Sequence, residues 1–66
     1  MKTMRLLLYL RRNGFQFTRR APEHFVLRNG DTIVVVPRQS ELRPDTVADI
    51  CRKAGLAVLS FVLSLL

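Results

Sequence analysis

Apolar positions recur with helical spacing at the start of the chain and with strand-like alternation further on. Leu6, Leu7 and Leu10 form one stripe, which predicts a helix over residues 3–12, and Asn13-Gly14 supplies a helix stop. Three short runs then alternate or are rich in β-branched side chains, as strands are: 15–19, 24–28 and 32–36. The pattern therefore predicts one helix followed by a three-stranded antiparallel meander.

A second amphipathic pattern follows the strands. Pro44 suits the first position of a helix, because its missing N–H costs nothing there, and Gly55 suits the residue beyond its end. Between them one apolar stripe has spacing i, i+3, i+4, i+7: Val47, Ile50, Cys51 and Ala54. Residues 56–66 are predicted to form a third, short helix. The expected fold is α+β, in the order α-β-β-β-α-α, as a single domain over residues 1–66.

The Asn29-Gly30 pair is the strongest local signal, since it favours a two-residue hairpin turn. That turn would place Val26 opposite Ile33. We expect the face with Val26, Ile33 and Val35 to pack on the helices. The opposite face, which carries Phe25, Leu27 and Val34, would then be open to a partner.

Composition narrows the classes of function. The 66 residues carry 11 Lys and Arg against 5 Asp and Glu, a net charge of +6. A chain this short cannot enclose a large active-site cavity, and its basic balance favours nucleic acid or an acidic protein as partner. One cysteine and one histidine cannot form a disulfide framework or fill a zinc tetrahedron, so we expect no metal and no cofactor. A reducing cytoplasm is the simplest compartment.

The apolar tail is the remaining unusual segment. As a helix, residues 56–66 would be about 16 Å long, roughly half of a bilayer core, so no membrane span is expected. Their apolar surface exceeds what so small a domain can bury, which favours self-association or contact with a partner protein over burial in the core or a membrane surface. The expected partner interface consists of Phe25, Leu27, Val34, Phe61, Val62 and Leu66.

Several segments, in order and in register, resemble the HicA toxins of bacterial and archaeal toxin–antitoxin pairs. The resemblance covers about residues 3–56 and is carried by Leu6-Leu7-Leu8-Tyr9-Leu10-Arg11-Arg12-Asn13-Gly14-Phe15, His24, Val35-Val36-Pro37, Glu41-Leu42-Arg43-Pro44-Asp45-Thr46-Val47 and Ala54-Gly55-Leu56. It implies a fold like the double-stranded-RNA-binding domain, a metal-independent ribonuclease that acts on messenger RNA, and neutralisation by a HicB-type antitoxin.

The resemblance also assigns the candidate site. The essential histidine of the family maps onto His24, the one histidine of the sequence, which would be the catalytic base, since imidazole is the side chain best suited to proton transfer near neutral pH. Four arginines are the candidate RNA-binding residues: Arg19, Arg20, Arg28 and Arg38.

An alternative function remains beside the enzyme. The family's Gly-Ser pair before the histidine is Pro22-Glu23 here, and a second histidine common in the family is Gln39. Pro and Glu restrict the approach of an RNA backbone, and Glu repels phosphate. These departures favour a diverged, non-catalytic module that binds nucleic acid or protein.

Overall fold

Within residues 1–65, which a computed structural model describes except for the side chain of Arg20, three helices and three strands follow the predicted order. They are α1 (Thr3–Arg12), β1 (Gln16–Arg20), β2 (His24–Asn29), β3 (Thr32–Pro37), α2 (Pro44–Lys53) and α3 (Val58–Ser64). The strands form one antiparallel sheet in the order β1-β2-β3. The predicted α+β class is confirmed.

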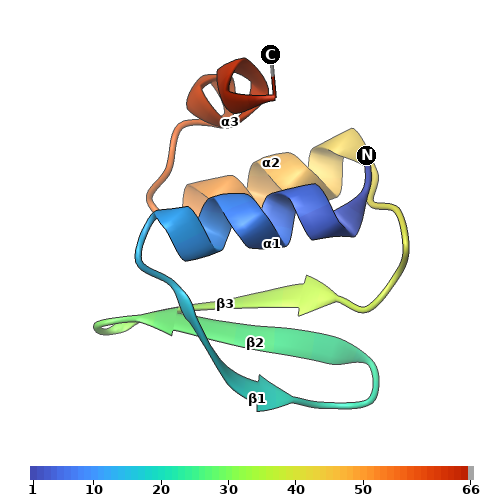
Figure 1. The fold of residues 1–66 in the computed structure, drawn as a ribbon, viewed down its shortest axis with the longest axis vertical. Coiled ribbons are helices and arrows are strands. Elements are labelled where there is room, and N and C mark those ends of the chain that lie inside the picture. The colour runs from blue at the N-terminus through green and yellow to red at the C-terminus, as the bar shows by residue number, and fades with distance from the viewer. Residues whose placement is uncertain (66) are drawn as a thin grey trace.

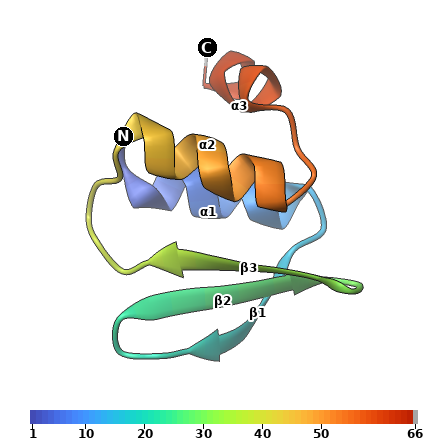
Figure 2. The ribbon, with the colours of Figure 1, turned by 180° about the vertical axis from the view of Figure 1, so that it is seen from behind.

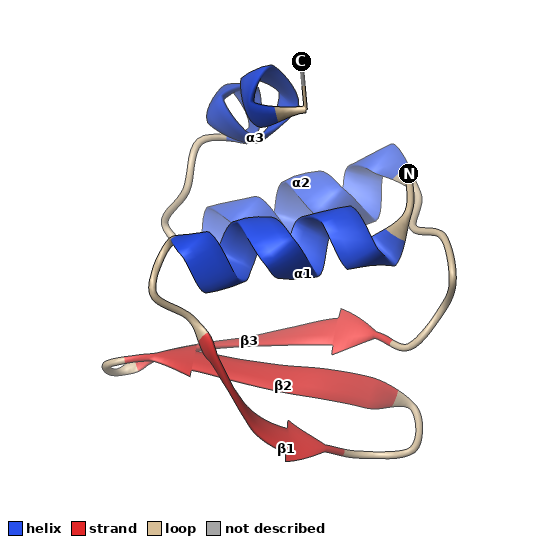
Figure 3. Ribbon diagram, viewed as in Figure 1, coloured by secondary structure: helices blue, strands red, loops and turns tan. Residues whose placement is uncertain are grey.

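The elements stack in three layers. α1 and α2 lie side by side over one face of the sheet, and α3 lies on the far side of these two helices (Figures 1 and 2). Within the described part of the chain, the opposite face of the sheet carries no helix (Figure 3). The start of α1, the start of β2 and the end of β3 lie at one end of the molecule, on the right in Figure 1.

The two long helices form where the apolar stripes predict them. Leu6 and Leu10 of α1 are completely buried, as is Cys51 of α2. Pro44 occupies the first turn of α2, as predicted. Basic residues occupy the last turn of both helices, where they interact favourably with the negative end of the helix dipole: Arg11, Arg12, Arg52 and Lys53.

The β2–β3 turn lies one residue beyond the predicted Asn29-Gly30 pair. Val26 pairs with Val35 rather than with Ile33, and the two-residue loop is Gly30-Asp31. The predicted register was therefore wrong by two residues, although the predicted hairpin exists and its loop length is as expected.

Turn geometry and a distant contact explain this difference. Gly30 has φ 61°, whereas Asp31 has no positive φ, which matches the type II′ turn with glycine at its first central position. Asn29 stays in the strand, and its Nδ2 donates to the Asn13 carbonyl at 3.2 Å. Gly14, with φ 92°, leaves room for that side chain, since a Cβ there would lie 3.1 Å from Asn29 Nδ2.

The sheet packs on the helices through the face opposite to the predicted one. Leu27, Val34 and Val36 are buried, whereas Ile33 and Val35 are 57% and 48% exposed. The predicted face was wrong because its apolar residues on β2 are interrupted by charged or polar neighbours. The face with Leu27 presents an unbroken apolar surface to α1 and α2.

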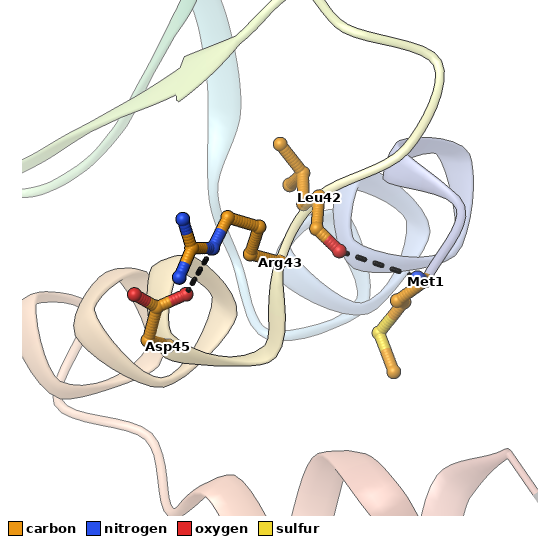
Figure 4. A network of polar contacts seen from close by, with 4 residues as sticks. All are labelled: Met1, Leu42, Arg43 and Asp45. Carbon is orange, nitrogen blue, oxygen red and sulfur yellow. Dashed lines mark hydrogen bonds and ion pairs between the residues drawn. The ribbon is translucent and has the colours of Figure 1, made fainter.

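The N-terminal residues are fastened to the segment between β3 and α2. The Met1 ammonium donates to the Leu42 carbonyl at 3.2 Å (Figure 4). Leu42 N–H in turn donates to the Met1 carbonyl at 2.7 Å. Thr3 N–H also donates to the Ser40 carbonyl at 3.1 Å. Arg43 and Asp45 form an exposed ion pair at 3.3 Å beside these hydrogen bonds. These bonds fix one end of α1 above the end of β3.

α3 confirms the predicted third helix, and it docks mainly through Phe61, with Val58 partly buried against the same core. Phe61 is fully buried. Leu59, Val62 and Leu63 are exposed. Among the described residues, no helix is both long enough and apolar enough to cross a membrane.

Candidate functional site

His24 begins β2 on the sheet face that no helix covers. It is exposed, and it pairs with Pro37, the last residue of β3. A shallow depression of about 390 Å³ surrounds it, lined also by Pro22, Glu23, Arg38 and Gln39. The imidazole therefore lies at an open end of the sheet, where a large linear substrate can reach it.

Arg38 connects the two segments that line this depression through two hydrogen bonds. Its backbone N–H donates to the Glu23 carbonyl at 3.0 Å. Its Nη1 donates to the Ala21 carbonyl at 3.4 Å. Both bonds tie the loop before β2 to the end of β3, and so they keep Arg38 in the wall of the depression that His24 also lines.

A bulge in β1 places a second arginine on the face of His24. Phe17 pairs with Leu27, but the next pair is Arg19 with Val26, so Thr18 is an extra residue. Thr18 Oγ1 donates to the Val26 carbonyl at 3.3 Å. Because cross-strand partners share a face, Arg19 lies on the same face as Val26, two residues along β2 from His24.

The other predicted arginines are placed differently. Arg28 shares the face of His24, but it lies four residues further along β2, about 13 Å away. Its Nε donates to the Gly30 carbonyl at 2.5 Å. The backbone of Arg20 pairs with Phe25, and its side chain is outside the description. The structure thus places Arg38 in the wall of the depression at His24, Arg19 on the same sheet face as His24, and Arg28 at the other end of the hairpin.

The predicted partner interface does not exist as an open surface for most of its residues. Leu27, Val34 and Phe61 are buried in the core of the chain itself, so they do not form an open surface. Phe25 is partly buried, Val62 is exposed, and Leu66 lies outside the described residues. Sequence reasoning missed the exposed pair of Ile33 and Val35, because two apolar sheet faces competed and the alternation alone did not choose between them.

The arrangement can support acid–base chemistry on a phosphodiester. An exposed imidazole can accept a proton, and a guanidinium at the same depression can bind the phosphate oxygens. Within residues 1–65, no group of three or more His, Cys, Asp and Glu could hold a metal ion.

Comparison with known proteins agrees with the order of these elements. The family model described as the HicA toxin of bacterial toxin–antitoxin matches residues 5–56, from α1 to the residue after the Gly55 stop of α2. No curated protein matches the chain. A toxin of this kind has, in general, an antitoxin as its partner. Because the match extends over well more than half of the 66 residues, the protein belongs to the HicA toxin family of toxin–antitoxin pairs.

Proposed function

We propose that this toxin is an endoribonuclease that cleaves messenger RNA with His24 as general base. The observation that supports this most directly is the shared depression, which the exposed residues His24 and Arg38 both line. Arg19 on the same sheet face adds a second guanidinium near the path of the RNA. No metal takes part in the proposed mechanism.

The reaction follows from these two kinds of side chain. His24 removes the proton of a ribose 2′-OH, and the 2′-oxygen attacks the adjacent phosphorus. Arg38 stabilises the extra negative charge on the pentacoordinate phosphorus. The P–O5′ bond then breaks, and the leaving 5′-oxygen takes up a proton from His24 or from water. The products are a 2′,3′-cyclic phosphate and a 5′-OH end.

The proposed antitoxin is a HicB-type protein that binds the open sheet face. Ile33 and Val35 provide an exposed aliphatic surface there, and Arg19 and Arg28 flank it with positive charge. An acidic protein with an apolar centre complements such a surface. A protein bound there would cover His24 at the same time.

The decisive experiment compares wild-type protein with His24→Ala on a purified messenger RNA. Loss of a general acid–base group typically lowers the rate about 10²- to 10⁴-fold, so we expect cleavage to fall by that factor. Lys53→Ala, at the exposed end of α2, is the matched control and should cleave like the wild type. Chelator should have no effect, and the 5′ fragment should end in a cyclic phosphate. Cleavage that survives His24→Ala, or that stops with chelator, would contradict the mechanism.

A non-catalytic binding module is the second candidate, and Glu23 favours it. This carboxylate lines the same depression as His24, where it opposes the approach of a phosphate. In this case clean wild-type protein would bind RNA without cleaving it. Glu23→Ser would then be the variant that gains cleavage, measured in the same assay, whereas Glu41→Ser, on the segment after β3, would not.

A further inference from the structure

A second depression lies beside the one at His24 and shares Arg38 and Gln39 with it. It also has a volume of about 390 Å³. Met4 and Leu7 of α1 and Phe25 of β2 give it an apolar interior, and Lys2 lies at its rim. None of the described residues that line it is acidic. Its size is that of a small-molecule pocket rather than of a groove for a helix.

We propose that this pocket binds one unpaired nucleobase of the RNA, on the nucleotide next to the phosphate held at His24. The inference rests on the proposed function, because it names a subsite for the same substrate. It also makes a separate claim, namely that Phe25 and Arg38 form a stacking site for a base.

The stacking geometry is already present in the folded chain. Arg38 Cζ lies 4.9 Å from the centroid of the Phe25 ring. The ring of Phe17 is 5.7 Å from that of Phe25 in an edge-to-face arrangement. Bases stack on both aromatic rings and guanidinium planes. Because the Arg38 guanidinium lies over the Phe25 ring, a base that enters the pocket can stack on the guanidinium or take its place on the ring.

Polar groups for the base edge and the backbone lie at the rim. The exposed side-chain amide of Gln39 offers a donor and an acceptor, and the Ser40 hydroxyl offers either. Lys2 and Arg38 can neutralise the flanking phosphates. An apolar interior with a few polar groups at its edge is the usual composition of a pocket that binds a flat heterocycle.

The wall of the pocket is held in place before any ligand arrives. Thr3 N–H donates to the Ser40 carbonyl at 3.1 Å, and Thr3 Oγ1 donates to the Gln39 carbonyl. Because these bonds use only the Gln39 main chain, its side chain stays available to a base. A preformed site loses less entropy when a ligand binds.

The two depressions fit one strand of RNA. His24 and Phe25 are consecutive in β2, so their side chains lie on opposite faces of the sheet. Arg38 and Gln39 lie between the two sites and contribute to both. A strand that crosses this end of the sheet can leave a phosphate at His24 while its neighbouring base turns into the pocket beside Phe25.

The test measures binding of a single-stranded RNA that cannot be cleaved because every ribose is 2′-O-methylated. One abasic position is moved along this RNA, and affinity is measured for wild type and Phe25→Leu. We expect wild-type affinity to fall about 5- to 100-fold at one position, as for loss of one base–aromatic stack. We expect Phe25→Leu to bind intact RNA more weakly and to show no further loss at that position, because the two changes remove the same contact.

A second pair of variants keeps the test valid if Phe25→Leu does not fold. Met4→Glu places a carboxylate at the pocket, whereas Leu8→Glu places it one turn along α1, outside both depressions; both residues are exposed. We expect Met4→Glu to remove the position-specific abasic effect and Leu8→Glu to preserve it.

The outcomes separate this inference from the proposed function. An abasic effect that depends on Phe25 or Met4 supports the base pocket, whether or not His24→Ala affects cleavage. RNA binding with an abasic effect that these variants do not change overturns the base pocket and leaves the nuclease proposal standing; the pocket would then suit an apolar side chain of a protein partner. Failure of wild-type protein to bind RNA overturns both.

Discussion

The ring of Phe61 packs against that of Tyr9, with centroids 4.9 Å apart and planes inclined by 47°. Among the described residues of α3, Phe61 is the one that is buried. This contact joins α3, which lies beyond the family match at residues 5–56, to α1 of the family domain. Phe61 is therefore the buried anchor of the extension, with Val58 and Leu65 partly buried against the same core, while Leu59, 68% exposed, faces solvent.

Removing this anchor should cost much of the stability of so small a protein. We expect Phe61→Ala to lower the free energy of unfolding by about 3–5 kcal/mol, the usual cost of truncating a buried phenylalanine. Leu63→Ala, on the exposed side of the same helix, should cost less than about 0.5 kcal/mol. Urea unfolding followed by far-UV circular dichroism measures both. Equal urea midpoints of unfolding for the two variants would show that Phe61 does not anchor α3 in a way that stabilises the fold.

The exposed side of α3 should make the protein associate with itself at micromolar concentration. Leu59, Val62 and Leu63 form an apolar surface on a helix without acidic residues in its first turn or basic residues in its last, and burial of such a surface favours association. Sedimentation velocity should show a species larger than the 7.6 kDa monomer.

The double variant Leu59→Ser, Leu63→Ser should be monomeric. The matched control, Ile33→Ser with Val35→Ser on the sheet face, should associate like the wild type. A wild-type protein that sediments as a clean monomer would contradict the prediction.

Arg19 should contribute to RNA affinity through charge rather than to the chemical step. Each phosphate contact with single-stranded nucleic acid contributes about 0.7 to the slope of log affinity against log salt. We expect Arg19→Ala to weaken binding and to reduce that slope by about this amount. Arg52→Ala is the control, since Arg52 is ion-paired with Asp49 on α2. An unchanged slope for Arg19→Ala would exclude Arg19 from the RNA path.

Cys51 should make stability depend on pH in the alkaline range. Desolvation by burial raises the pKa of the Cys51 thiol in the folded protein. The folded state therefore favours the protonated thiol, and its contribution is complete below the pKa of the unfolded thiol and is lost as pH rises through the folded pKa. We expect stability to fall more steeply with rising pH for wild type than for Cys51→Ala, measured by thermal melts. If the melting temperatures of wild type and Cys51→Ala fell in parallel with rising pH, the prediction that Cys51 causes this pH dependence would be wrong.

The local parts of the fold were predictable because each rests on neighbouring residues. The stripe of α1 and the Pro44 start of α2 depend on spacing within one helix, and both are confirmed. The hairpin register could not be predicted in this way, because the sequence Asn29-Gly30-Asp31 is compatible with a turn at Asn29-Gly30 and with the observed turn at Gly30-Asp31. The bond from Asn29 to Asn13, sixteen residues away, accompanies the type II′ turn that is observed.

In the candidate site, too, some residues could be predicted from the sequence, whereas features that depend on distant contacts could not. His24 could be named through the family resemblance, and Arg38 through its charge. The pocket at Phe25 had no local signal, because it forms only when the N-terminal residues meet the segment after β3. Met1 and Leu42 are 41 residues apart in sequence, so no pattern within a short window indicates their contact. The buried sheet face was likewise decided by packing against helices distant in sequence.

The extra residue in β1 determines the electrostatic character of the open sheet face. If Thr18 were paired regularly instead of bulged, it would lie opposite Val26, and Arg19 would lie opposite Phe25 and turn toward the helices. Deletion of Thr18 would, by contrast, keep Phe17 opposite Leu27 and Arg19 opposite Val26, so both side chains would stay on their present faces. The position of the bulge thus decides which face of the sheet carries the Arg19 cation, without any change of residue identity.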